Sequence, residues 1–305
     1  MLEKECFCKE LGVIPRDVIQ GIPKDLPTFA SMANFYAAKQ FISYFAKART
    51  VYNTHSPFLY ALTQKVLEDD RHFYAFDELE ALRQKMLNVE TQMEFVDFGA
   101  GSRDLGKKTT RKIKEVAATS LISPLKAKWM FRLVDFLKPD NILEIGTSLG
   151  LSALYMQAAA RNAQVVTLEG NPDSARVAQK NFSIFPYARN IKVEIGRFED
   201  TLEPALQQLR KADFIFMDGN HRKTPTLAYF EQMRPFLSEK SVIILDDIYW
   251  SEGMTEAWNL LRNDAQVSLS VDLFHFGILF FRKENREKEH HVLAPSKWKP
   301  WVRAW

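Results

Sequence analysis

The chain has 305 residues, of which 46% are hydrophobic and 26% charged, and its formal net charge is +3. These values are typical of a globular protein with a large core, and this net charge is too small to indicate nucleic-acid binding by itself. Its two cysteines, Cys6 and Cys8, exclude a disulfide framework, and no apolar run is long enough to span a membrane. Because acids stand where a signal peptide would be apolar, we expect a cytoplasmic protein.

The first 93 residues predict an N-terminal helical region. Residues 29–48 are rich in Ala, Phe and Tyr, and residues 76–87 show an amphipathic pattern. Residues 53–58 form a break in which Pro57 suits the start of the next helix.

Residues 94–140 are expected to form a strand and turn followed by a basic helical cap. The strand and glycine turn lie in EFVDFGAGSR, Glu94–Arg103, but no strand ending in an acid follows them. We therefore predict an ordered hairpin or loop, lying over the site as a lid, and not a second cofactor motif. Arg103–Arg132 holds nine basic and two acidic residues, which favours either a solvated helix face or a patch that steers an anionic substrate. Because aromatic residues are not interleaved with these charges, we do not expect nucleic-acid binding.

The stretch NILEIGTSLGLSALYM, Asn141–Met156, predicts a buried strand, a glycine turn and a helix. This arrangement is typical of a nucleotide-cofactor site, in which glycines let the ligand approach the backbone closely. Further strands are predicted at 164–168, 191–195, 213–217, 241–245, 267–272 and 274–282, with helices between most of them. Strands that alternate with helices indicate a parallel sheet with right-handed crossovers.

Acidic residues end the predicted strands. They are Glu144, Glu169, Asp218, Asp246 and Asp247. Ligands on parallel sheets bind at the carboxyl ends of the strands, so this acidic rim is the predicted site. Glu169 suits the two hydroxyls of a ribose, whereas Glu144 beside the turn would disfavour a pyrophosphate. These acids favour S-adenosylmethionine (SAM), which carries a ribose and an ammonium group but no phosphate.

Four segments together resemble the class I SAM-dependent methyltransferases, particularly the catechol O-methyltransferase type. They are LEIGTSLGLSAL, TLEGNPDSARVAQKNF, DFIFMDGNH and VIILDDIYWSEG, and the resemblance covers about residues 120–283. It implies an α/β, Rossmann-like methyltransferase fold with a seven-stranded, mostly parallel sheet whose last strand is antiparallel. The expected division is 1–93, 94–140, a SAM-binding domain at 141–283, and a basic Trp-rich tail at 284–305.

The resemblance also implies roles for single residues. Glu144, Gly146 and Ser148 would face the methionine part of SAM, Glu169 the ribose, and Phe198 and Glu199 the adenine. Thr147, Gly150, Ser152 and Asp218 complete the expected cofactor residues. Asp218, Asp246 and Asp247 occupy the family's Mg²⁺ positions, although the last is an amide in the family. His221 stands where the family has the lysine that acts as its general base. The expected catalytic residues are therefore His221, Asp246 and Asp247.

The predicted function is SAM-dependent O-methylation of a small or carrier-bound acceptor, and it is left open whether Mg²⁺ assists the reaction. One alternative is a metal-independent N-methyltransferase that acts on an amine or RNA. A second is a non-catalytic SAM-binding or partner-binding subunit, whose N-terminal helices and Trp-rich tail would be the working surfaces. That tail, KWKPWVRAW, would dock on its own chain or on a partner. Assembly as a homodimer is left open.

Overall fold

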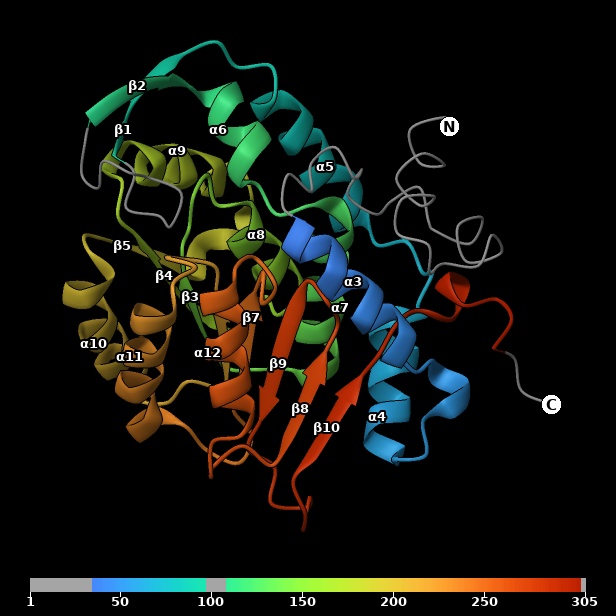
Figure 1. Cartoon of the computed structure of the whole chain (residues 1–305). Helices are drawn as coiled ribbons and strands as arrows, with labels where there is room; N and C mark the ends of the chain where they lie inside the picture. Colours follow the sequence, from blue (N-terminus) through green and yellow to red (C-terminus); the bar gives the residue numbers. More distant parts are fainter. Residues whose placement is uncertain (1–34, 97–107, 303–305) are drawn as a thin grey trace. The chain divides into compact units, whose positions relative to one another are not determined.

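The computed structural model describes residues 35–96 and 108–302, which fall into two compact units (Figure 1). The larger unit is Asp70–His291, and the smaller one joins the chain up to Asp69 with the segment from Val292 onward. This division differs from the expected boundaries at residues 93 and 283. All of DFGAGSR, residues 97–103, lies outside the described residues.

A single eight-stranded sheet forms the centre of the larger unit (Figure 1). In spatial order the strands are β10 (Glu289–Val292), β8 (Leu269–Asp272), β9 (Phe276–Phe280), β7 (Val242–Asp246), β6 (Phe214–Met217), β3 (Asn141–Ile145), β4 (Gln164–Glu169) and β5 (Ile191–Ile195). Strands β3 to β7 pair in parallel, whereas β9 runs antiparallel to both β7 and β8. The predicted fold class is therefore confirmed. The eighth strand, β10, was not predicted, because its sequence EHHV lacks an apolar run and its residues are only partly buried.

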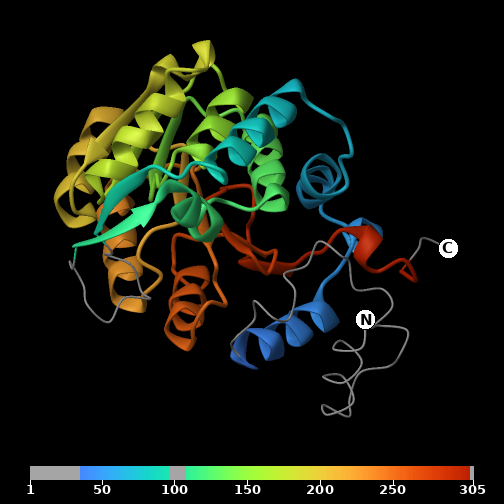
Figure 2. The same ribbon diagram turned by 90° about the horizontal axis from the view of Figure 1, so that it is seen from above.

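Helices cover both faces of this sheet (Figure 2). The helices of the larger unit are α5 (Tyr74–Met86), α6 (Ile113–Ser120), α7 (Pro124–Leu137), α8 (Leu151–Ala159), α9 (Pro172–Phe182), α10 (Phe198–Leu209), α11 (Lys223–Met233) and α12 (Glu252–Arg262). Apolar side chains of α10, α11 and α12 pack with those of the central strands in one buried cluster, which includes Leu206, Phe230 and Trp258. Helices α7 and α8 pack on each other at the opposite face.

Caps fix where several of these helices begin. The side chain of Ser123 accepts a hydrogen bond from the backbone N–H of Lys126, and Pro124 follows it as the first residue of α7. Asn171 caps α9 in the same way, again with a proline, Pro172, in the first position. Such caps satisfy backbone donors that have no partner inside the helix, so the residues just before each of these two helices set where it begins.

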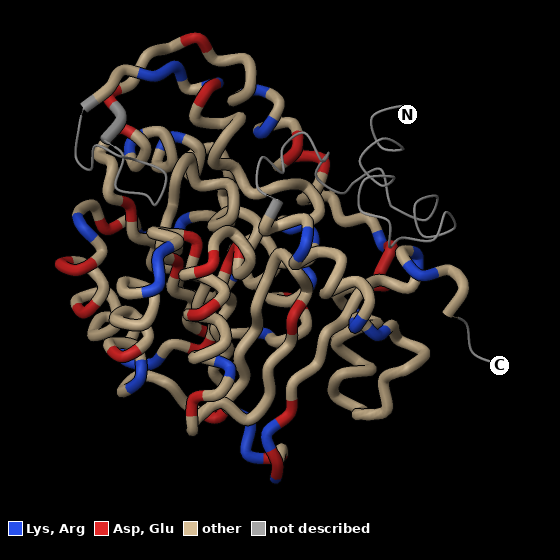
Figure 3. Tube along the Cα trace, viewed as in Figure 1, with Lys and Arg blue, Asp and Glu red and all other residues tan. Residues whose placement is uncertain are grey.

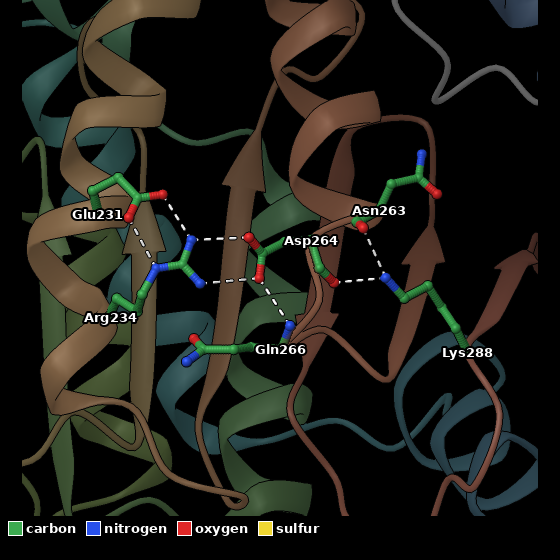
Figure 4. A network of polar contacts seen from close by, with 6 residues as sticks. All are labelled: Glu231, Arg234, Asn263, Asp264, Gln266 and Lys288. Carbon is green, nitrogen blue, oxygen red and sulfur yellow. Dashed lines mark hydrogen bonds and ion pairs between the residues drawn. The ribbon is translucent and has the colours of Figure 1, made fainter.

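An ion-pair network ties the far ends of α11 and α12 together (Figure 4). Arg234, just after α11, contacts Glu231 at 2.7 Å and Asp264 at 2.9 Å. The Nζ of Lys288 donates to the backbone oxygens of Asn263 and Asp264 at 2.8 and 2.6 Å. The network therefore fastens the segment before β10 to the loop after α12.

The predicted hairpin consists of β1 (Gln92–Val96) and β2 (Lys108–Lys112), which pair antiparallel. Its backbone is bonded to the start of α9. The N–H of Glu94 donates to Asp173 Oδ2 at 2.7 Å, and Asn171 Nδ2 donates to the carbonyl of Glu94 at 3.2 Å. The hairpin is thus anchored beside the end of β4.

The smaller unit contains α3 (Phe35–Lys47), α4 (Pro57–Leu62) and the π-helical turn η2 (Thr63–Leu67), and the C-terminal segment packs against these elements. Lys299 Nζ donates to the carbonyl of Ala48 at 2.6 Å, and Ser296 bonds to Glu68. Trp298 is buried. Of the two docking alternatives for the tail, the described part therefore packs on its own chain, while Trp305 lies outside the described residues.

Within residues 35–96 and 108–302, no helix combines the length and the apolar character that a membrane crossing requires.

Candidate active site

A cavity of about 640 Å³ lies at the carboxyl ends of the parallel strands. Its wall is built from the turn after β3, the end of β4, the start of α10, the loop after β6, the end of β7 and the α6–α7 connection. This is the edge at which the sequence placed the site. All of these segments belong to the larger unit.

The glycine turn after β3 needs Gly146 for two reasons. Its φ is +105°, a conformation that side chains with a Cβ rarely adopt. A Cβ at this position would also lie 2.7 Å from the backbone oxygen of Asp218. The turn after β3 and the loop after β6 therefore touch backbone to backbone, and both line the cavity.

Glu169, the last residue of β4, is held by backbone donors on both sides. Its Oε2 accepts from the N–H of Ser148 at 2.7 Å, and its Oε1 accepts from the N–H of Asn171 at 2.8 Å. Burial raises the pKa of Glu169 to about 7, although these backbone hydrogen bonds lower it. Its carboxylate lines the cavity with two fixed oxygens, an arrangement that suits two neighbouring hydroxyl groups of a ligand.

Some of the predicted cofactor residues line the cavity and others do not. Those that line it are Gly146, Ser148, Glu169, Phe198, Glu199 and Asp218. Those that are buried away from it are Glu144, Thr147, Gly150 and Ser152. Gly150 serves packing, because a Cβ there would lie 2.5 Å from the ring of Phe182.

Glu144 differs most from its expected place. It is fully buried in β3 and accepts a hydrogen bond from the hydroxyl of Thr167, which in turn bonds to Thr147 at 2.5 Å. Burial raises the pKa of Glu144 to about 8. At neutral pH Glu144 is therefore mainly uncharged, and it is linked through Thr167 to Thr147 in the glycine turn. The sequence instead predicted a charged acid that faces the methionine part of the cofactor.

Phe198 and Glu199 open helix α10 at the cavity wall. The ring of Phe198 packs closely on Gly219, where a Cβ would lie 2.4 Å from it. Glu199 Oε1 accepts from the hydroxyl of Tyr229 at 3.0 Å. Phe198 and Tyr229 thus offer aromatic surface in the part of the wall where the resemblance puts an adenine.

The predicted catalytic residues meet where β6 and β7 end. His221 Nε2 lies 3.4 Å from Asp218 Oδ1, and both line the cavity with Asp246 and Asp247. Burial opposes a charge on His221, but the hydrogen bond to Asp218 and the charges of Asp218 and Asp247 outweigh it, so the pKa of His221 is raised. An imidazole oriented by a carboxylate is well suited to accept a proton from a bound hydroxyl.

Sequence reasoning missed Lys126, the residue that binds this acidic cluster. Its Nζ lies 2.5 Å from Asp246 Oδ2 and 3.1 Å from Asp247 Oδ1. Lys126 was counted only as part of a basic run, and it comes from α7, before the first motif. Nothing in its spacing could have linked it to β7, since only the packing of α7 brings them together.

The predicted metal ligands are Asp218, Asp246 and Asp247, and their arrangement does not fit a divalent ion. Mg²⁺ requires several oxygens at about 2.1 Å, but an ammonium group already binds an oxygen of Asp246 and another of Asp247. Among the described residues, no group of three or more His, Cys, Asp or Glu side chains is placed to hold a metal ion. The metal at these acids therefore stays a prediction, and the positions of the described side chains do not support it.

The other described charges of the basic run have different neighbours, and Figure 3 shows blue segments at separate places along the chain. Lys112 and Lys114 pair with Glu90 at the surface, whereas Arg132 is buried. Lys128 lies over the ring of Phe76. The described residues of this stretch thus have separate partners, and Lys126 alone among them lines the cavity.

Comparison with known proteins supports the resemblance. Residues 143–248 match the model of a family described as a methyltransferase domain. A catechol O-methyltransferase from Niastella koreensis is 30% identical over 129 residues, which cover 42% of this chain and 58% of that enzyme. A catechol O-methyltransferase from Mycobacterium tuberculosis is 29% identical over 134 residues, covering 44% of this chain and 59% of that enzyme.

A solved structure has the same fold. The SAH-bound methyltransferase PaMTH1 from Podospora anserina superposes with a TM-score of 0.52 at 18% identity, covering 75% of this chain and 98% of that one. The chain matches less than three-fifths of the length of the curated relatives described above. Residues 143–248 are thus similar to a methyltransferase domain, and the chain has the fold that the sequence predicted.

Proposed function

We propose that this chain, built around a methyltransferase domain, is a SAM-dependent O-methyltransferase that acts on a small hydroxylated acceptor. The observation that carries the proposal is the division of the cavity wall. On the β3–β4 side stand the glycine turn and Glu169, whose carboxylate can accept hydrogen bonds from ribose hydroxyls. On the β6–β7 side stand His221 and the acids that follow those two strands. A donor and an acceptor molecule can thus bind side by side.

When bound, SAM supplies a methyl group on a sulfonium, so that an acceptor oxygen forms the new O–CH₃ bond as the S–CH₃ bond breaks and sulfur keeps the electron pair. Positioning and removal of the acceptor proton are then the main tasks of the protein. His221 is the proposed base. If its Nε2–H donates to Asp218, its Nδ1 is left to receive the proton.

The acceptor side carries an aromatic residue, Trp250, that favours a flat substrate. Trp250 lines the cavity, is 54% exposed, and its ring lies 6.3 Å from that of His221. A planar phenol or catechol could pack on this indole with its hydroxyl directed at the acids. The names of the curated relatives point to the same acceptor class.

The test is a radiometric assay with methyl-labelled SAM and a matched panel of catechol, phenol, benzylamine and a short RNA. We expect label in the catechol first, and lower turnover with the single hydroxyl. Label in benzylamine or RNA but in neither hydroxylated compound would instead support the N-methyltransferase alternative. SAM binding without transfer to a broad panel would favour the non-catalytic subunit.

A further inference from the structure

Lys126 is the most deeply placed cation of the cavity wall. Its side chain is 12% exposed, and its partners Asp246 and Asp247 are 3% and 32% exposed. The Nζ also lies 5.7 Å above the centre of the Phe276 ring. The two carboxylate oxygens within 3.1 Å of the Nζ favour the ammonium form of Lys126.

The fold holds this ammonium from both sides. Lys126 stands in the first turn of α7, whose start is fixed by the Ser123 cap. Asp246 ends the buried strand β7, and the backbone N–H of Asp247 is bonded to the carbonyl of His275 at 2.9 Å. Asp247 has a φ of +48°, so the chain turns sharply at this residue. A lysine held by two anchored carboxylates has little freedom to leave.

One hydrogen-bond donor of Lys126 and one acceptor of Asp246 have no partner among the described residues. An ammonium has three N–H donors, and two of those on Lys126 are taken by Asp246 and Asp247. Among the described residues, nothing takes the third. The Oδ1 of Asp246 is likewise buried without a hydrogen-bond partner in the described part of the chain. Both residues line the cavity, where a bound hydroxyl could accept the third N–H of Lys126.

We propose that Lys126 is a catalytic residue that replaces a divalent ion, with its ammonium stabilising the acceptor oxygen as that oxygen loses its proton. This inference rests on the proposed function. The acceptor hydroxyl gives its proton to the base, and its oxygen accepts a hydrogen bond from the third N–H of Lys126. A lone pair of that oxygen then forms the bond to the methyl carbon. The S–CH₃ electrons stay on sulfur, and Lys126 keeps all its protons. Turnover therefore requires no metal.

The first test uses the unaltered chain. Mn²⁺ is titrated and followed by electron paramagnetic resonance, and turnover is measured before and after dialysis against EDTA. We expect no stoichiometric Mn²⁺ binding and unchanged turnover. One tightly bound Mn²⁺ together with turnover that EDTA abolishes would overturn the inference. This test does not depend on any variant of Lys126, so it can be carried out even if those variants fail to fold.

The second test compares Lys126→Met and Lys126→Ala with Lys138→Met. Lys138 is a matched control, because it follows the same helix and forms a lysine–aspartate ion pair with Asp135 at the surface. We expect turnover of Lys126→Met to fall by about 10²- to 10³-fold with SAM affinity unchanged. Lys126→Ala should acquire Mn²⁺ binding at the freed carboxylates, whereas the control should match the unaltered chain.

Turnover retained by Lys126→Met would overturn the role of Lys126. Calorimetry with SAM separates this failure from failure of the proposed function. If the unaltered chain binds SAM but needs a metal, only the role of Lys126 is wrong. If it binds no SAM, the proposed function itself is wrong.

Discussion

The backbone N–H of Ser148 donates to the carboxylate of Glu169 at 2.7 Å, which joins the glycine turn after β3 to the end of β4. One side chain thus supports the turn and also presents its oxygens to the cavity. A change at Glu169 should therefore affect the donor site far more than the acceptor site.

Glu169→Gln should weaken SAM binding by about 10- to 100-fold, since a hydrogen bond to a charged group contributes about 1.5–3 kcal/mol. The measurement is isothermal titration calorimetry. Glu194→Gln is the matched control, because Glu194 lies in the neighbouring strand β5 and pairs with Lys192. Equal affinities for the two variants would remove Glu169 from the donor site.

SAM affinity should depend on pH through the same residue. The pKa of Glu169 in the free protein is about 7. The ribose hydroxyls favour the ionised carboxylate, so binding below that value releases a proton. Affinity should then be constant above about pH 7 and fall by up to about tenfold for each pH unit below it. Calorimetry in buffers with different ionisation enthalpies counts the released protons. A count near zero at pH 6 would contradict this linkage.

Gly146→Ala should lower the free energy of unfolding by about 1–3 kcal/mol, because it combines a positive φ with a Cβ close to the backbone of Asp218. It should also weaken SAM binding, since the loop carrying Asp218 must move. Gly253→Ala provides the control. Its Cβ would meet nothing nearer than 3.7 Å, and the position is helical, so stability should change by no more than about 1 kcal/mol. Urea unfolding of both variants tests the contrast.

His221→Gln should reduce turnover by about 10²- to 10⁴-fold and leave SAM affinity unchanged, as expected for loss of a general base. Added imidazole should restore part of the activity. Full activity in the variant would show that another group removes the acceptor proton.

Much of the sheet could be predicted because its strands are short apolar runs ended by acids or glycines. Residues 213–217, for example, were predicted as a strand, and β6 occupies Phe214–Met217. β10 was missed because polar residues such as His290 and His291 form it, and only pairing with β8 defines it. For the β1–β2 hairpin, only the first strand and the turn were predicted. The second strand, β2, is rich in basic residues, and its sequence was interpreted as helical.

The candidate site was predictable where it follows strand ends, as for Glu169, Asp218 and Asp246. The sequence could not distinguish a carboxylate that points into the cavity from one that supports the turn, as Glu144 does, because both types follow apolar residues. Nor could it find Lys126, whose position depends on the packing of α7 and not on any motif.

The measurement that tests the central claim most directly is calorimetric titration of the whole chain with SAM, in the presence of EDTA. The account predicts one binding site per chain, competition by SAH, and a loss of affinity in Glu169→Gln but not in Glu194→Gln. Absence of SAM binding by a folded chain would contradict it.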